Sequence, residues 1–207
     1  MSKIVNDQQN MSDRFEKVLQ NPNIKDFDKK FITSIKEWYE RKGTLSDKQK
    51  EWLVKIEHRV SEEHIQSKEL WRQGYDEEKR EIANICARYY KFAGYYSDLV
   101  SKVLNDPDYI PTENQWRAMC CNKYAARVIE VARAEPKYPV GSVVQFRIGS
   151  NRPRLPGVTS SMAIVLQTDS SPVTRAAKGS KKYLVLPIGS PKSVEVEERQ
   201  IKKSRHK

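Results

Sequence analysis

The chain has 207 residues, of which 38% are hydrophobic and 31% charged, and its formal net charge is +11. This apolar content is too high for a fully disordered chain, and the length suits one large domain or two small ones. A transmembrane helix is excluded because no apolar run reaches the roughly 18 residues that a membrane span needs. The start of the chain, M-S-K-I-V-N-D-Q-Q-N, lacks the apolar core of a secretory signal, so we expect a cytoplasmic protein.

The positive charge is concentrated in the last third of the chain. Residues 1–136 contain 24 Lys and Arg against 23 Asp and Glu, whereas residues 137–207 contain 14 against 4. This distribution indicates a basic module attached to a part with balanced charge. Such a localised positive field favours a polyanion as the partner.

The N-terminal part of the chain predicts helices. Residues 1–25 are polar apart from a short amphipathic piece around Phe15 and Val18, and we expect a flexible N-terminal arm there. From Asp26 onward, apolar residues recur at spacings of three and four up to Gly43, which predicts an amphipathic helix. Similar runs predict further helices, so we expect a helical domain over residues 26–135.

Two helix starts in this domain share the same pattern. Ser46 and Gln49 have the spacing of a capping box, and Thr112 and Gln115 repeat it. The second box predicts a long helix that continues to about Ala134. In both places a Trp-bearing helix follows the box, so the domain could consist of two degenerate copies of a helical hairpin.

After Pro136 the pattern changes to short β-type runs separated by Gly, Pro, Ser or Asn. The expected strands are 141–148, 162–167, 183–188 and 194–198. A sheet this small hides its edges best by closing on itself, which predicts a small barrel over residues 138–201 and a basic tail over 202–207. The predicted fold class is therefore α+β, with an N-terminal all-helical domain followed by a small β-barrel.

Two resemblances to known families accompany this pattern. The order P-V-G-S-V-V-Q-F, G-V-T-S-S-M-A-I-V-L, K-K-Y-L-V-L-P, V-E-V-E-E-R-Q-I resembles an SH3-like small barrel of the kind found in KOW and Tudor modules. The helical segment F-I-T-S-I-K-E-W-Y-E-R-K-G-T-L-S-D-K-Q is similar to hairpin modules in accessory proteins of tailed bacteriophages, which implies the host cytoplasm as the location. Neither resemblance implies catalytic residues.

Catalytic and metal-binding patterns are missing from the sequence. His58 and His64 lack the H-E-x-x-H spacing of a zinc site, and there is no phosphate-binding loop or nucleophile elbow. Cys120 and Cys121 are adjacent on a predicted helix, so their side chains diverge by about 100° and cannot easily share an ion. We expect no enzyme activity, no metal and no other cofactor.

The aromatic residues of the helical part have helical spacing. We expect the four tryptophans to lie in a core or in a dimer interface rather than to stack on bases: Trp38, Trp52, Trp71 and Trp116.

The basic residues of the last third are the candidate binding residues, in three clusters. They are Arg147, Arg152 and Arg154 around the first loop, Arg175, Lys178, Lys181 and Lys182 in the stretch V-T-R-A-A-K-G-S-K-K-Y, and Lys202, Lys203, Arg205 and Lys207 in the tail. The loops of a small barrel open at its rim, so the first two clusters could converge. Arg and Lys beside Gly, Ser and Pro can approach a phosphate backbone closely.

These observations predict a non-catalytic nucleic-acid-binding protein with little sequence selectivity, and single-stranded RNA is favoured slightly over DNA. The basic barrel and tail would contact phosphates, and the helical domain would support a homodimer or bind a protein partner. Two alternatives stay open: an adaptor that docks on a transcription or translation complex, and a phage assembly component. No membrane partner is expected.

Overall fold

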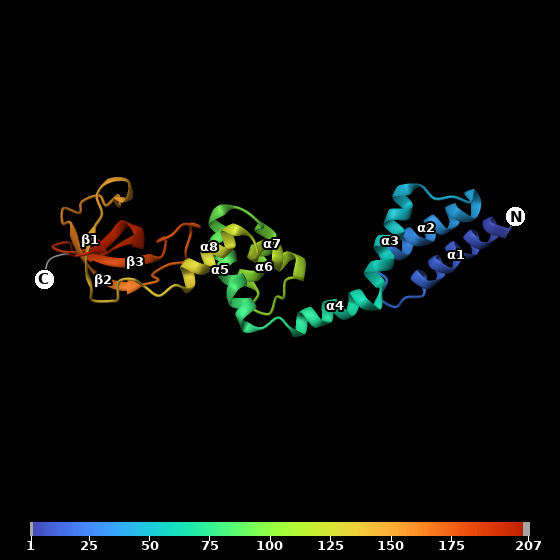
Figure 1. Cartoon of the computed structure of the whole chain (residues 1–207), viewed down its shortest axis with the longest axis horizontal. Helices are drawn as coiled ribbons and strands as arrows, with labels where there is room; N and C mark the ends of the chain where they lie inside the picture. Colours follow the sequence, from blue (N-terminus) through green and yellow to red (C-terminus); the bar gives the residue numbers. More distant parts are fainter. Residues whose placement is uncertain (1, 205–207) are drawn as a thin grey trace. The chain divides into compact units, whose positions relative to one another are not determined.

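The computed structural model describes the backbone of residues 2–204 and the side chains of residues 10–204. The chain divides after Gln73 into two compact units, which are described separately below. Within the described residues, helices precede a C-terminal antiparallel sheet, so the predicted α+β class is confirmed (Figure 1). No helix in this part of the chain combines the length and apolar character needed to cross a bilayer.

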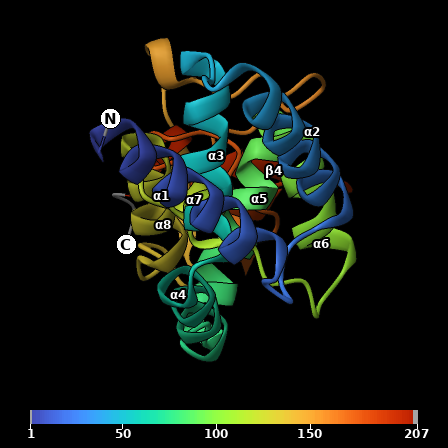
Figure 2. The same cartoon turned by 90° about the vertical axis from the view of Figure 1, so that its right-hand side faces the viewer.

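Unit 1 is a helical bundle. Its helices are α1 (Ser2–Leu19), α2 (Asp26–Lys42), α3 (Asp47–Val60) and α4 (Glu62–Gln73). The first three helices pack against one another, as Figures 1 and 2 show. Their core contains fully buried Ile32, Leu53 and Ile56. In contrast, α4 contains no buried residue.

The prediction of a flexible arm over residues 1–25 is wrong for helix α1. Phe15 and Val18 are buried in the core of unit 1. The guanidinium of Arg14 also forms an ion pair of 2.7 Å with Glu57 of α3. The amphipathic piece is short, but the apolar surface of α2 and α3 gives it a partner, and tertiary packing stabilises the helix.

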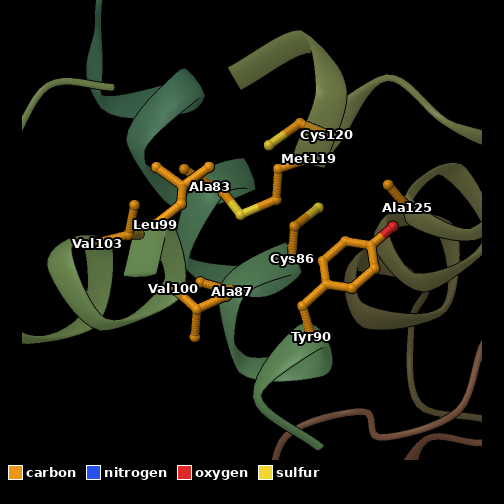
Figure 3. Close-up of a cluster of buried hydrophobic side chains, with 10 residues drawn as sticks. All are labelled: Ala83, Cys86, Ala87, Tyr90, Leu99, Val100, Val103, Met119, Cys120 and Ala125. Carbon is orange, nitrogen blue, oxygen red and sulfur yellow. The ribbon is translucent and has the colours of Figure 1, made fainter. Parts of the chain in front are cut away.

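Unit 2 contains further helices and the sheet. Its helices are α5 (Glu77–Ala93), α6 (Ser97–Asn105), α7 (Glu113–Cys120) and α8 (Lys123–Arg133). They surround a core in which Cys86, Met119 and Cys120 lie together with small and aliphatic residues of α5 and α6 (Figure 3). The division after Gln73 falls within the helical domain predicted over 26–135, and α5–α8 belong to the same compact unit as the sheet.

Both predicted capping boxes are confirmed. The side chain of Ser46 accepts a hydrogen bond from the Gln49 amide, and Gln49 accepts one from the Ser46 amide. Thr112 and Gln115 make the same pair of bonds at the start of α7. The surrounding helices differ, since α6 separates α5 from the second box. The internal duplication therefore stays a prediction.

The single long helix predicted from Thr112 to Ala134 is wrong, because it breaks between α7 and α8. Asn122 caps α8, and its side-chain oxygen accepts hydrogen bonds from the amides of Tyr124 and Ala125. The same oxygen accepts a bond of 3.0 Å from the Tyr90 hydroxyl. Asn competes well with a continuing helix when its side chain can satisfy the free amides of a new one.

Two of the four tryptophans lie outside the cores, so for them only the expected dimer interface remains as a prediction. Trp38 and Trp52 are 44% and 46% exposed on unit 1, where Trp52 makes a tilted ring contact with Phe31. Trp71 and Trp116 are half-buried. The indole N–H of Trp116 donates to the carbonyl of Lys79, which attaches α7 to α5. Helical spacing predicts which side of a helix is apolar, but not which residues of that side are covered by neighbouring helices.

The sheet follows the predicted order of strands. Its strands are β1 (Val143–Phe146), β2 (Met162–Thr168), β3 (Lys182–Pro187), β4 (Val194–Glu197) and β5 (Ile201–Lys203). All neighbours are antiparallel in the order β4-β3-β2-β1-β5. The basic tail predicted over 202–207 is wrong at its start, because Lys202 and Lys203 pair with β1.

The two outer strands of this sheet are joined by a single short 3₁₀ turn, η2 (Glu198–Gln200). Three residues can span only about 10 Å, so the sheet has to curl for β4 to lead into β5. The inner face holds a core that includes Val144, Val165 and Val185, all fully buried.

Candidate nucleic-acid interface

The stretch between β2 and β3 packs against the helices of unit 2. Val173 is 7% exposed and lies with Val128 and Val131 of α8 in a small apolar cluster. Ala176 also contacts this cluster. The V-T-R-A-A-K-G-S-K-K-Y segment is therefore a docking loop rather than an open turn.

Lys181 is wrong as a predicted phosphate contact, because its side chain is buried. Its ammonium lies 2.5 Å from Asp169 Oδ1 and donates to the Ala132 carbonyl oxygen at 3.2 Å. Ala132 belongs to the last turn of α8, where carbonyl oxygens lack helical partners and a positive charge is favourable. This lysine thus attaches the sheet to α8.

Gly179 and Ser180 fix the end of the same loop. Gly179 has φ of +72°, and its carbonyl accepts a 2.8 Å hydrogen bond from the amide of Arg199 in η2. A Cβ at this position would lie 3.0 Å from the Cβ of Arg199. The fully buried Ser180 hydroxyl bonds to carbonyl oxygens within the loop. Only glycine meets both the conformation and the close approach.

The four acidic residues of the basic module also gather near this loop. Asp169 pairs with Lys181, Glu195 with Lys182 at 3.4 Å, and Glu197 with both Arg175 at 3.6 Å and Arg199 at 2.5 Å. Glu198 accepts a 2.9 Å bond from the Tyr183 hydroxyl. Most of the positive charge of this predicted cluster is therefore neutralised within the fold, and Lys178 is its exposed member without an acidic partner among the side chains of residues 10–204.

Two pKa shifts accompany these contacts. Burial raises the pKa of Tyr183, and its hydrogen bond to Glu198 raises it further. Burial alone would raise the pKa of Glu195, but hydrogen bonds from Ser171 and Ser170, together with Lys182, lower it overall. Both groups therefore keep their ordinary charge states near neutral pH.

The first cluster has a different environment. The loop between β1 and β2 forms an open groove with a volume of about 740 Å³, and Arg147, Arg152 and Arg154 line it. Arg152 and Arg154 are exposed. None of the three pairs with a carboxylate of residues 10–204, and Arg147 Nε donates to the Ile201 carbonyl oxygen at 3.1 Å. Their positive charge is therefore available to a ligand.

Sequence reasoning missed one member of this groove. Ile148 lines it and is 83% exposed, the largest exposed fraction among the large hydrophobic residues of the described chain. The one feature of the sequence that could have identified Ile148 as a groove residue is its position between Arg147 and the turn at Gly149. An exposed aliphatic side chain beside arginines offers a contact to an apolar surface such as a base.

Turn η2 connects the two basic loops. Its amides from Glu198 and Arg199 bond to the docking loop, while the Gln200 carbonyl accepts a 2.8 Å bond from the amide of Arg147. Both loops are thus attached to η2 by backbone hydrogen bonds, while the convergence of their basic side chains on one patch stays a prediction. The acidic residues pair with most basic residues of the docking loop but with none of the three arginines of the groove. The arginine groove is therefore the main candidate for nucleic-acid binding.

The third cluster lies only partly within the described residues. Lys202 is half-buried next to Ile201, and Lys203 is exposed at the end of β5. Lys202 follows the residue whose carbonyl holds Arg147, so it extends the positive surface beside the groove. Arg205 and Lys207 lie outside the described residues.

Within the described part of the chain, no group of three His, Cys, Asp or Glu is placed to hold a metal ion. Comparison with protein-family models, curated proteins and solved structures finds no match. Function must therefore be inferred from the chemistry of these residues.

Proposed function

We propose that the C-terminal module is an SH3-like small barrel that binds single-stranded nucleic acid in the arginine groove, without catalysis and with RNA favoured over DNA. One observation carries this proposal: the acidic residues of the module neutralise the docking loop and leave Arg147, Arg152 and Arg154 unpaired along one groove. Unpaired guanidinium groups on a concave surface suit phosphate oxygens, which they can bind in a bidentate way.

The composition of the groove supports weak sequence selectivity. The aromatic residues of the module, Tyr138, Phe146 and Tyr183, are buried, so they do not provide a stacking platform. Residues 137–204 contain 3₁₀ turns but no α-helix that could enter a duplex groove. Phosphate contacts then dominate the affinity, which should fall steeply with salt.

The helical part supports a separate role as a partner or dimer surface. Phe92 in the last turn of α5 and Tyr95 just after that helix are each 66% exposed. Exposed aromatic residues are typical of protein interfaces. We place the dimer or partner contact of the helical part there.

Titration of a labelled single-stranded RNA with the full chain tests the proposal. At about 50 mM salt we expect saturable binding to unrelated sequences with similar affinities, and weaker binding to a duplex. A chain that binds no strand under these conditions would contradict the proposal. Matched RNA and DNA strands of one sequence test the preference between them.

A further inference from the structure

The outer face of the sheet is unusually apolar. Side chains along a strand alternate between the two faces, and the inner positions of β1–β3 are buried. The outward positions of these strands, with the residue after β3, include Val143, Met162, Ile164, Leu166, Leu184, Leu186 and Ile188. The outward polar ones are Gln145, Gln167 and Lys182.

These apolar side chains form one continuous surface. Val143 lies opposite Ile164 in the β1–β2 pairing, and Ile164 lies opposite Leu186 in the β2–β3 pairing. Directly opposed side chains in a sheet are about 5 Å apart, so the three form a row across the strands. Val143, Ile164, Leu166 and Ile188 are 43%, 38%, 42% and 46% exposed, respectively. We call this surface the outer apolar face.

A solvated face of an antiparallel sheet normally carries polar side chains. A contiguous exposed apolar patch with a polar rim instead marks an interaction site. The packing of unit 2 does not use the outer apolar face, since α8 contacts the sheet through Val173 and Lys181 of the docking loop. The contact between α8 and the sheet therefore leaves the outer apolar face exposed within unit 2.

The charges around this face restrict what can cover it. Two lysines border it, Lys192 in the β3–β4 turn and Lys202 on β5, while Lys182 on β3 is paired with Glu195. A second copy would bring the same lysines together, which is unfavourable. Nucleic acid is disfavoured too, because the outward positions hold no aromatic side chain on which bases could stack.

We propose that the outer apolar face binds an acidic amphipathic segment of a partner protein. Aliphatic side chains of that segment would cover Ile164 and its neighbours, and its Asp and Glu residues would face the lysine rim. The apolar residues of this site differ from the residues that line the arginine groove, and Lys202 lies beside both. The inference stands independently of nucleic-acid binding.

Selection of random displayed peptides on the immobilised full chain tests this inference. We expect the selected peptides to combine Leu, Ile or Phe with Asp and Glu, and to bind less tightly at higher salt. In the double variant Ile164→Thr/Leu166→Thr their affinity should fall at least about tenfold, because two buried aliphatic contacts are weakened. Thr suits exposed strand positions, so the fold should persist, as circular dichroism can verify.

The matched control is Val54→Thr, which makes a similar change at a 54% exposed position of α3 and should leave peptide affinity unchanged. Peptides that bind the double variant as tightly as the wild type would overturn the inference. So would a dimer in sedimentation analysis that the double variant abolishes, because a second copy would then occupy the face. Loss of RNA binding in the double variant would assign the face to nucleic acid and overturn it as well.

Discussion

Lys181 of the sheet module donates a hydrogen bond of 3.2 Å to the carbonyl oxygen of Ala132 in the last turn of α8. With the Lys181–Asp169 ion pair and the packing of Val173, this contact joins the sheet to the helices of unit 2. Lys181, which the sequence predicts as a nucleic-acid contact, thus has a structural role. Its substitution should therefore change the stability of the fold rather than the affinity for RNA.

We predict that Lys181→Met lowers the free energy of unfolding by about 1–3 kcal/mol, since it leaves a helix-end carbonyl without its donor and Asp169 without its partner. Because Asp169 is half-exposed, water can solvate its carboxylate in the variant, so the loss of stability is smaller than for a fully buried ion pair. Urea unfolding measures the change, and RNA affinity should be retained.

Lys178→Met is the matched control, because it makes the same chemical change at an exposed position of the same loop. It should alter stability by no more than about 0.5 kcal/mol. Equal effects of the two substitutions would contradict the structural role of Lys181.

Gly179→Ala should be more destabilising than an ordinary glycine substitution. It combines a φ of +72° with a Cβ only 3.0 Å from Arg199 Cβ, so η2 has to shift. Gly189→Ala provides the comparison, since Gly189 has φ of +79° and open space around its missing Cβ. We expect thermal and urea unfolding to show a further loss of about 1 kcal/mol or more for Gly179→Ala. A loss no greater than that of Gly189→Ala would refute the close approach.

The three cysteines should differ in reactivity. Cys86 and Cys120 are buried in the core, whereas Cys121 is exposed (Figure 3 shows the buried pair). A thiol reagent should therefore modify one cysteine rapidly in the folded chain, and Cys121→Ser should remove that reaction. Rapid modification of two or three thiols without denaturant would contradict this packing.

Stability should also decrease in alkaline solution. A hydrogen bond with Cys86 and burial raise the pKa of Cys120 above its ordinary value. A raised pKa in the folded state contributes stability that is complete below the thiol's unfolded pKa of about 8.5 and is lost as pH rises above it. Urea unfolding between neutral pH and about pH 10 should show this decrease, and Cys120→Ala should reduce its slope. An identical slope in the variant would contradict the shift.

Local patterns in the sequence predicted α2, α3 and α5, both capping boxes and the positions of the first four strands, but not α6. The capping boxes at Ser46 and Thr112 were predicted correctly because each involves residues only three positions apart. The prediction of one long helix is wrong at Asn122, which caps a new helix. The Tyr90 hydroxyl of α5 donates a hydrogen bond to this cap, and Tyr90 is too distant in the sequence for a local pattern to reveal the contact. Helix α1 was missed for the same reason, because its stability depends on α2 and α3.

The candidate site could be predicted only in part. Charge composition located the basic module, and Arg147, Arg152 and Arg154 remain candidates. The assignment of Lys181 fails because its partners, Asp169 and Ala132, are brought to it by the sheet and by α8. Sequence counts reveal how many acidic residues a module has, but not which basic residues they neutralise.

The salt dependence of RNA binding tests the central proposal most directly. We predict that changing Arg147, Arg152 and Arg154 together to Gln lowers the slope of log K against log salt by about 2, the loss expected for three phosphate contacts on a single strand. A charge-matched control changes three exposed lysines of unit 1 to Gln: Lys29, Lys30 and Lys48. Its slope should match that of the wild type. Equal slopes for the arginine variant and the wild type would contradict binding in the arginine groove.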